Sequence, residues 1–562
     1  MTTEQLSAIV KRLILVGLTI LAIFSIGHSL ATSLGQPQIQ SRLELYQTNL
    51  LLHAAEWQGK ATEVAKPQES TPDVKAARKA LIGDKPFTSA LEQYEEARKT
   101  AQTTQGKIVA KLKELSSEPE PDVVIASRER RGAIATDPEL AKPQVEYPPV
   151  EEVPSSSQQR QQLQQSYDRV ETLIDELDLR IGVLQAQQGK TDAALKTWNQ
   201  FIERETKNAV SAPDTSLVET AQGLMALWSK PPRILPDAES LIQKNLEGWF
   251  RYQALSQLYQ LQQRQDALAE LQAKERKIAE QAVVKITLIS AIPGFGGLLG
   301  LGLLVFLLGQ WLIQGKRSLL ATNGDVRWET PWNWEIIWQV FILGFFFIGQ
   351  ILLPLFFGSL GLNPVNLSVR MKAFYVLASY VLMATGGLLV LYFSVKPFSP
   401  LPEDWFRCKL RGNWTVWGIG GYLVALPLVI LVSVLNQKLW QGQGGSNPIL
   451  PLALEGQDRI ALTLFVLTAC VAAPIFEEIF FRGFLLPSLT RYTPVWGAIL
   501  ASALLFAIAH LSFSEVLPLF TLGIVLGVVY TRSRNLLASI LLHGLWNAGT
   551  LLSLFVLGSG SN

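Results

Sequence analysis

The second half of the chain is a series of long apolar runs, each close to the length of a membrane-spanning helix. A bilayer core needs about 20 apolar residues per helix. Eight such runs lie near residues 286–314, 336–360, 373–395, 414–435, 459–480, 495–511, 516–530 and 536–557. They predict an all-α fold, a polytopic membrane helix bundle of about eight core spans.

A ninth apolar run lies near the N-terminus, from Leu13 to about Leu34, behind Lys11 and Arg12. It predicts an uncleaved membrane anchor over residues 1–35. The small residues at 31–33 leave a second interpretation open, a cleaved signal peptide. The topology of the other spans is the same under both interpretations.

Residues 36–285 carry apolar positions at helical spacing among many polar ones, and they predict a soluble helical domain. Helical spacing is interrupted at 83–86, and a Pro-rich, charged stretch near 117–157 predicts a linker. Segments near 181–198 and 255–271 share a helix–turn–helix pattern. That pattern predicts either tetratricopeptide-like hairpins or an ordinary antiparallel bundle. In both cases we expect a helical surface that binds a protein partner.

Charge divides the chain at the same point. Residues 1–285 carry 34 Lys+Arg and 37 Asp+Glu, whereas residues 286–562 carry 15 and 10. The charged fraction falls from about one residue in four, as in soluble proteins, to about one in eleven. This excludes a single globular domain and a disordered chain, and it disfavours a nucleic-acid-binding protein. Cys408 and Cys470 are too few for a disulfide scaffold or a thiolate zinc site.

The basic residues of the membrane half predict its topology. With a cytoplasmic N-terminus, the outer loops of this half hold only four Lys or Arg residues, whereas the cytoplasmic segments hold thirteen. Two of the thirteen, Lys11 and Arg12, precede the N-terminal run; the other eleven, all in residues 286–562, are Lys316, Arg317, Arg327, Lys396, Arg407, Lys409, Arg411, Arg482, Arg491, Arg532 and Arg534. Residues 36–285 are therefore expected on the outer side, periplasmic or lumenal.

A pair of adjacent carboxylates ends the span that begins near Arg459. Charged groups inside hydrocarbon are costly and usually mark function. Glu478 and Arg482 are four residues apart, so they share a helix face and predict a buried salt bridge. Glu477 points about 100° away from that face and is left free for chemistry. Glu515, by contrast, is expected to be a solvated loop residue.

Two further spans repeat the four-residue interval. Phe506 and His510 end one of them, and His543 and Asn547 lie within the last. A carboxylate in a low-dielectric site can act as a general base, and with an imidazole it can activate a water. A second imidazole and an amide can stabilise an oxyanion. Two histidines and a carboxylate can also bind zinc, although the His-Glu-x-x-His motif of zinc peptidases is missing.

These three motifs together resemble a known family. Glu-Glu-x-x-x-Arg at 477–482, Phe-x-x-x-His at 506–510 and His-x-x-x-Asn at 543–547 are similar to the motifs of the CAAX-protease and bacteriocin-processing (Abi) family of intramembrane endopeptidases. The order and the consecutive spans agree with that family. The resemblance covers the protease core, 459–557, and extends to an eight-helix domain over 286–562. It does not cover residues 1–285.

The resemblance implies roles for the motif residues. Glu477 and His510 would be the water-activating pair, and His543 and Asn547 would stabilise the oxyanion. The remaining motif residues, Glu478, Arg482 and Phe506, would be structural or orienting. The family implies either a glutamate-type mechanism without a metal cofactor, which we favour, or a zinc enzyme that uses Glu477, His510 and His543.

We therefore expect an intramembrane endopeptidase that cleaves a membrane-associated protein or a lipidated or peptide substrate in the lipid bilayer. The alternative is a non-catalytic membrane scaffold or assembly factor that uses residues 36–285 to bind a protein partner. No nucleic-acid partner is expected.

Overall fold

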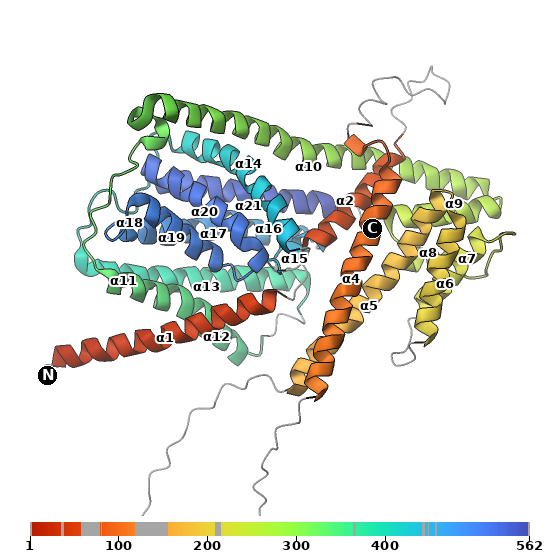
Figure 1. The fold of residues 1–562 in the computed structure, drawn as a ribbon, viewed down its shortest axis with the longest axis horizontal. Helices are drawn as coiled ribbons and strands as arrows, with labels where there is room; N and C mark the ends of the chain where they lie inside the picture. Colours follow the sequence, from red (N-terminus) through yellow and green to blue (C-terminus); the bar gives the residue numbers. More distant parts are fainter. Residues whose placement is uncertain are drawn as a thin grey trace, which may run out of the picture. The chain divides into compact units, whose positions relative to one another are not determined.

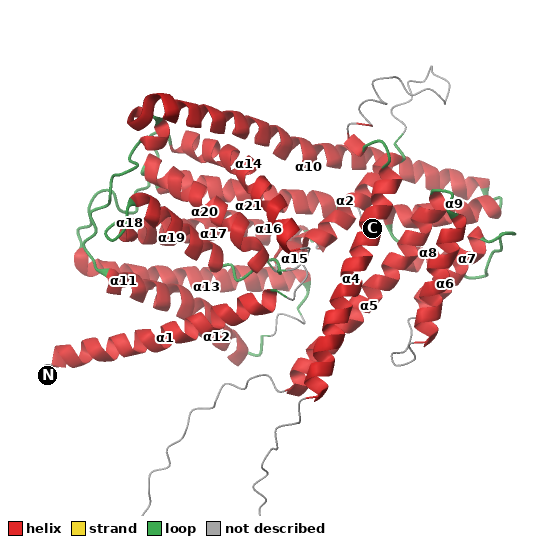
Figure 2. Cartoon of the chain, viewed as in Figure 1, coloured by secondary structure: helices red, strands yellow, loops and turns green. Residues whose placement is uncertain are grey.

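The structure, a computed structural model, describes residues 3–34, 39–57, 79, 81–117, 156–207, 215–362, 367–440, 444–447, 449–455 and 458–559. Every regular element within these ranges is a helix, which confirms the predicted all-α fold (Figure 2). The predicted linker lies, over 118–155, outside the described residues. The chain divides into two compact units, one of Met1–Asp84 with Lys274–Asn562 and the other of Lys85–Ala273.

In the described part of the first unit, long apolar helices lie side by side (Figure 1). Over the described residues, eight helices of the chain are long and apolar enough to cross a membrane, and a ninth apolar helix, α19, is shorter. The helices that carry these stretches are α1 (Thr3–Ser33), α10 (Gln265–Gln314), α11 (Trp334–Gln339) with α12 (Leu353–Ser359), α13 (Val369–Val395), α14 (Trp414–Trp440), α16 (Arg459–Val466) with α17 (Ala473–Glu477) and α18 (Leu486–Leu489), α19 (Val495–Ile508), α20 (Phe513–Ser533) and α21 (Leu536–Gly558).

Side-chain caps explain where several of these helices begin. The side chain of Asn333 accepts hydrogen bonds from the first-turn amides of α11, and Ser368 does the same for α13. Asp458 caps α16 and Asn535 caps α21. Each cap satisfies backbone N–H groups that have no partner inside the helix. The polar residues between the apolar runs therefore set the starts of the spans.

Small residues let the helices around the acid pair approach one another closely. A Cβ added at Gly523 of α20 would lie 2.9 Å from the Cβ of Ala503 on α19. Such close crossings are typical of membrane helices. A buried aromatic cluster packs beside them and includes Phe476, Phe480, Phe481, Phe484 and Trp332. The acid pair thus sits next to a dense apolar core.

Four loops of the first unit meet at one end of the bundle (Figure 1). They follow α10, α13, α18 and α20, and hydrogen bonds join them directly. The bonds run from Trp328 N to Thr490 Oγ1 (3.1 Å), from Trp405 Nε1 to Glu329 O (2.8 Å), from Asn323 Nδ2 to Arg532 O (3.0 Å) and from Leu536 N to Arg407 O (2.9 Å). Most of the basic residues that predicted one side of the membrane lie in or beside these loops, whereas Arg482 is buried inside the bundle.

Two shorter helices complete the described part of the first unit. Leu43, Tyr46 and Leu50 of α2 (Ile39–Ala55) pack in a cluster with α21 and with α15 (Ile449–Glu455). His53 of α2 hydrogen-bonds Glu275 of α10 at 2.6 Å, and both side chains are buried. Residues 39–57, which the sequence grouped with the soluble domain, thus pack in the unit of the membrane helices.

The second unit is a small helical domain with its own core. It contains α4 (Pro86–Ser117), α5 (Ser156–Gln187), α6 (Thr191–Lys207), α7 (Thr215–Trp228), α8 (Ala238–Asn245) and α9 (Gly248–Leu261). Gln188 donates to the carbonyl of Phe87 and Arg160 to that of Leu115, so α4 and α5 run antiparallel. The predicted interruption at 83–86 is observed, with Gly83 at φ +82° just before α4.

The predicted hairpin near 181–198 is formed by α5 and α6. A Cβ added at Gly182 would overlap the buried indole of Trp198, whose Nε1 donates to Leu179 O at 3.2 Å. The small residue at the crossing therefore makes room for the tryptophan. Whether these hairpins form a tetratricopeptide-like repeat stays a prediction.

Candidate active site

The span that carries the acid pair is not a regular α-helix. It changes to π-helical winding at Leu467–Ala472 and again at Glu478–Leu485. In the first π segment, Ala473 N donates to Thr468 O, five residues back. The next donor in this register would be residue 474, which is a proline and has no N–H. The carbonyl of Ala469 therefore lacks its helical donor. Such π segments are frequently found at functional sites.

Asn547 supplies the missing donor. Its Nδ2 lies 2.7 Å from Ala469 O. One turn earlier on α21, Gly544 lies beside the neighbouring carbonyl, and a Cβ added there would lie 2.9 Å from Cys470 O. Asn547 and Gly544 therefore pack α21 against the π-helical segment that precedes Pro474. One of the two N–H bonds of the Asn547 amide is used in this contact, and the other is left for a second acceptor.

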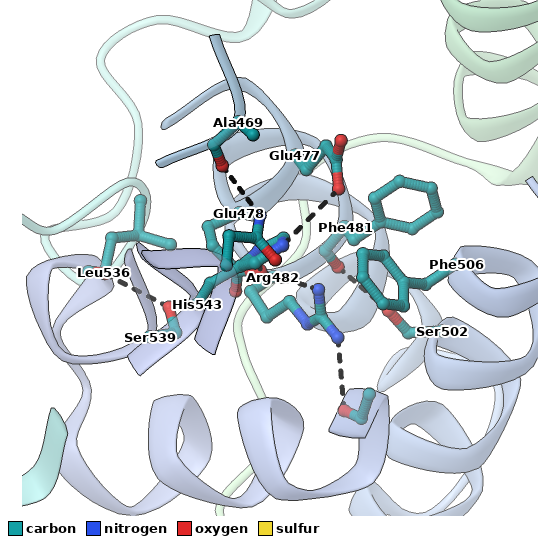
Figure 3. A network of polar contacts seen from close by, with 12 residues as sticks. Ala469, Glu477, Glu478, Phe481, Arg482, Ser502, Phe506, Leu536, Ser539 and His543 are labelled. Carbon is teal, nitrogen blue, oxygen red and sulfur yellow. Dashed lines mark hydrogen bonds and ion pairs between the residues drawn. The ribbon is translucent and has the colours of Figure 1, made fainter. Parts of the chain in front are cut away.

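Glu478 is the centre of a buried polar network (Figure 3). Its Oε1 accepts hydrogen bonds from Arg482 Nη1 at 2.8 Å and from His543 Nδ1 at 2.9 Å. Arg482 also donates to Gly523 O at 3.2 Å, and its guanidinium lies 4.4 Å from the centre of the Phe506 ring. The side chains of Glu478 and Arg482 are fully buried. The salt bridge predicted from their spacing is therefore present and holds three helices together.

This network fixes the tautomer of His543. A carboxylate can only accept, so Nδ1 of the imidazole carries the proton that it donates to Glu478. The other ring nitrogen, Nε2, then points toward Glu477, and it lies 3.9 Å from Glu477 Oε2. His543 thus stands between the two carboxylates of the pair.

Glu477 faces away from the salt bridge, as its spacing predicted. Its Oε1 accepts a hydrogen bond from the hydroxyl of Tyr380 at 2.8 Å. Its Oε2 is buried and has no hydrogen-bond partner among the described residues. An unsatisfied buried carboxylate oxygen is costly unless it binds something further. Oε2 of Glu478 also has no hydrogen-bond partner among the described residues, but the charge of Glu478 is paired with Arg482, whereas Glu477 has no such cation beside it. Glu477 is therefore the better candidate for chemistry.

His510 lies in the turn just after α19. Its Nδ1 lies 2.8 Å from the carbonyl of Phe506, which can only accept. The proton of a neutral His510 is therefore on Nδ1, and Nε2 is free to act as a base. Within the described residues, no hydrogen bond or ion pair joins His510 to Glu477. Phe506 lies beside both histidines instead. Its ring centre is 4.9 Å from that of His510 and 5.6 Å from that of His543.

Two residues near this site were not anticipated as part of it. Tyr380 comes from α13, 97 residues before Glu477. Its only signal in the sequence was a hydroxyl within an apolar span. Glu515 was expected to be solvated, but it is only partly exposed, accepts from Asn447 N at 2.7 Å and lies within electrostatic range of His510. The expectation for Glu515 was wrong because this residue lies in the first turn of α20, and that turn packs against the segment around Asn447.

The zinc alternative concerns Glu477, His510 and His543. Zinc ligands lie about 2.0–2.2 Å from the metal, so the donor atoms must be close to one another. Across the described ranges, no group of three or more His, Cys, Asp or Glu side chains is arranged to hold a metal ion. Glu477 Oε2 and His543 Nε2 lie 3.9 Å apart, but His510 is not grouped with them, so the side chains as they stand do not fit a three-ligand zinc site.

Comparison with known proteins points to the same part of the chain. Residues 459–549 match a family model described as Type II CAAX prenyl endopeptidase Rce1-like. The chain is 32% identical over 139 residues to an uncharacterized 24.3 kDa protein of Escherichia coli, a stretch that covers 24% of this chain and 58% of that protein. It is 23% identical over 137 residues to the membrane-embedded CAAX protease MroQ of Staphylococcus aureus (strain USA300), covering 23% of this chain and 54% of MroQ. No solved structure matches.

These matches confirm the predicted family resemblance for the C-terminal region. The matched stretch contains all seven motif residues. With the apolar helices, the matches show an integral, multi-pass membrane protein. The chain spans little more than half the length of either curated relative.

Proposed function

Because residues 459–549 carry an Rce1-like CAAX endopeptidase domain among apolar helices, we propose that the protein is an intramembrane endopeptidase that hydrolyses peptide bonds with a Glu477-activated water. One observation carries the proposal. The buried Oε2 of Glu477 has no hydrogen-bond partner in the described part of the chain and lies 3.9 Å from His543 Nε2. Two acceptor atoms at this spacing are a site for a water that donates to both.

In the proposed reaction, the water oxygen attacks the carbonyl carbon of the scissile bond while Glu477 takes one of its protons. The bond from Tyr380 to Oε1 leaves Oε2 as the basic atom. The tetrahedral intermediate then collapses, the C–N bond breaks, and the proton passes from Glu477 to the leaving nitrogen. General-base catalysis of this kind contributes about 10²–10⁴-fold in rate.

Two imidazoles flank this reaction in the proposal. His510, with Nε2 unprotonated, is the second group that can hold the water or carry its proton. While His543 is neutral, its Nε2 accepts from the water; once the imidazole is protonated, the same atom becomes a donor toward the developing oxyanion, and Glu478 stabilises the added charge through Nδ1 at 2.9 Å. The free N–H bond of Asn547 is a second donor. The proposed mechanism needs no metal ion.

The substrate that we propose is a membrane-associated protein or a lipidated peptide, because the reacting groups lie between helices that face lipid. The basic loops at one face support a cytoplasmic position for that face. The N-terminus would then be cytoplasmic and the second unit, within 36–285, would lie on the outer side. We propose that this helical unit binds a protein partner or orients the substrate.

The proposal is tested by comparing the protein termini in membranes of cells that make the wild-type chain or Glu477→Gln. The matched control is Glu335→Gln, which removes a carboxylate on α11 that pairs with Arg12 at 3.1 Å, outside the site. We expect termini that are present with the wild type and the control and absent with Glu477→Gln.

Identical sets of termini in all three strains would contradict the proposed protease activity. If loss of the chain causes a growth or assembly defect that Glu477→Gln rescues in full, the scaffold alternative explains the result. Stoichiometric zinc in the purified protein, lost in His510→Ala, would replace the metal-free mechanism with the zinc one.

A further inference from the structure

A pocket outside the proposed active site opens among the basic loops of the first unit. It has a volume of about 340 Å³ and lies between the end of α20, the starts of α14 and α21, and the loop after α10. The loop between α13 and α14 lines most of one side. All of these segments belong to the face on which the basic residues gather.

The lining of this pocket is strongly cationic. Five of its residues are Arg or Lys, and none is Asp or Glu: Arg407, Lys409, Arg411, Arg532 and Arg534. Two carboxylates lie near these cations: Asp404, 3.1 Å from Arg407 and 3.6 Å from Arg534, and Asp325, within electrostatic range of Arg532. Two carboxylates beside five cations leave an excess of positive charge. A pocket of this kind concentrates anions.

Two of these arginines are more than nine-tenths buried. Arg532 is 3% exposed, and its side chain contacts neutral groups, the carbonyl of Leu320 and the hydroxyl of Thr531. Arg534 is 7% exposed, stacks 3.4 Å over the Trp328 ring and donates to Val326 O. Its Nε and Nη1 have no hydrogen-bond acceptor among the described residues. Topology alone does not explain this arrangement, because basic residues that only mark one side of a membrane can stay in water.

Two helix N-termini add to the positive potential. α14 begins at Trp414 and α21 at Leu536, and the residues just before them, Asn413 and Asn535, both line the pocket. The N-terminus of a helix carries a partial positive charge. The first amides of α21 are bonded to Arg407 O and to Asn535, so this helix adds positive potential to the pocket and no N–H donors. Asn535 also bonds the backbone of Lys409 on both sides, through Lys409 N at 3.3 Å and Lys409 O at 2.7 Å. The loop that brings the lysine to the pocket is therefore held by the cap of α21.

One wall of the pocket is apolar. Trp414, Trp417 and Leu319 contribute to its lining, and Val416 on the same turn of α14 is exposed. An inorganic anion would use only the cationic wall. A molecule with a charged head and a hydrocarbon tail would use both walls, and such molecules are abundant at the end of a membrane span.

We propose that this pocket binds a phosphate ester, and that its source is the headgroup of an anionic phospholipid in the surrounding leaflet. The exposed Lys409 and Arg411 would contact the phosphate, the buried Arg532 and Arg534 beneath them would supply positive potential, and the tryptophans would contact the acyl region. Free phosphate shares the headgroup chemistry but lacks the tail.

The test uses the purified full-length chain in detergent and measures binding by native mass spectrometry and titration calorimetry. The probes are short-chain phosphatidylglycerol, short-chain phosphatidylcholine and inorganic phosphate. The variant is Lys409→Gln/Arg411→Gln, whose two side chains are exposed, so the fold is preserved. The matched control, Lys316→Gln/Arg317→Gln, removes two charges from the loop after α10 that do not line the pocket.

We expect phosphatidylglycerol to bind and the pocket variant to weaken its binding by about tenfold or more, because hydrogen bonds to charged groups contribute strongly. The control variant should change the affinity by less than about twofold. Equal weakening in the two variants, or equal affinity for phosphatidylcholine, would overturn the pocket as the site. Inorganic phosphate that binds as tightly as phosphatidylglycerol would support the phosphate site and overturn the lipid source. None of these results depends on protease activity.

Discussion

The Nδ1 atom of His543 lies 2.9 Å from Oε1 of Glu478, across 65 residues of sequence. Glu478 is also bonded to Arg482, so the carboxylate that accepts from the imidazole is held in a fixed position. The imidazole in turn directs Nε2 toward Glu477. The second glutamate of the pair is therefore connected to the first through a histidine from the last span, and the two adjacent acids have different surroundings.

The buried ion pair should be far more sensitive to the loss of one partner than an exposed pair. Arg482→Met leaves the carboxylate of Glu478 buried without its cation, which costs about 3–5 kcal/mol. The double variant Glu478→Gln/Arg482→Met removes the stranded charge and should recover much of that loss. Unfolding in mixed micelles, followed by circular dichroism, measures both. The control Arg370→Met breaks an exposed pair with Asp458 at 2.8 Å and should cost less than about 1 kcal/mol. Equal costs at the two sites would contradict the network.

Tyr380 is expected to position Glu477 rather than to react. Tyr380→Phe removes the hydrogen bond to Oε1 and leaves the ring in place, so kcat should fall about tenfold with KM unchanged. Tyr375→Phe is the matched control on the same helix, since its ring packs on Phe357 at 4.9 Å away from the acid pair. A rise in KM alone, or an equal effect of both variants, would exclude a positioning role.

Local spacing in the sequence predicted much of this site. The four-residue interval between Glu478 and Arg482 was enough to predict their salt bridge, and it implied that Glu477 would point elsewhere. The apolar runs predicted the spans to within several residues at most of their ends. These features depend on neighbours along one helix, which the sequence shows directly.

Contacts between different helices could not be predicted from the sequence in this way. Nothing in the spacing around Tyr380 indicates that it meets Glu477, and the partner of His543 depends on how α21 packs against the π-helical span. The donation from Asn547 to Ala469 follows from Pro474 only once the register of that π segment is known. The cationic pocket combines five basic residues that the sequence could assign to a side of the membrane but not to a common cavity.

The close contact of α5 and α6 makes a further prediction about the second unit. Gly182→Ala would place a methyl group in the Trp198 indole, and overpacking of this kind costs about 1–3 kcal/mol. Gly106→Ala is the control, because a Cβ at that helical position meets nothing within 4 Å and alanine favours helix. Hydrogen exchange of α5 and α6 in the full-length protein should rise in the first variant and not in the second. Unchanged exchange in Gly182→Ala would contradict the crossing.

The second unit should also lose stability as the pH rises from about 4 to about 7. Burial raises the pKa of Asp175 to about 7, against the opposing hydrogen bond from Arg204, from an ordinary value of 3.8. Arg204 is shared with Asp178 and Glu205, which leaves an excess of carboxylates. The folded state therefore holds the Asp175 proton to a higher pH than the unfolded state does, and that contribution is present below about 4 and lost through about 7.

Native-state hydrogen exchange of α5, corrected for the intrinsic effect of pH, measures this dependence. Protection should be greater at pH 5 than at pH 8 in the wild type, and the difference should shrink in Asp175→Asn, which cannot ionise. Asp168→Asn, an exposed position on the same helix, should behave like the wild type. A pH dependence that survives intact in Asp175→Asn would assign it to another group.

The most direct test of the central claim is the initial rate at which the purified protein, reconstituted in liposomes, cleaves a farnesylated CAAX peptide. We predict that Glu477→Gln lowers this rate by about 10²–10⁴-fold, that Glu335→Gln leaves it unchanged, and that a zinc chelator has no effect on the wild type. Wild-type cleavage that persists in Glu477→Gln would contradict the role of Glu477 as the base that activates the water.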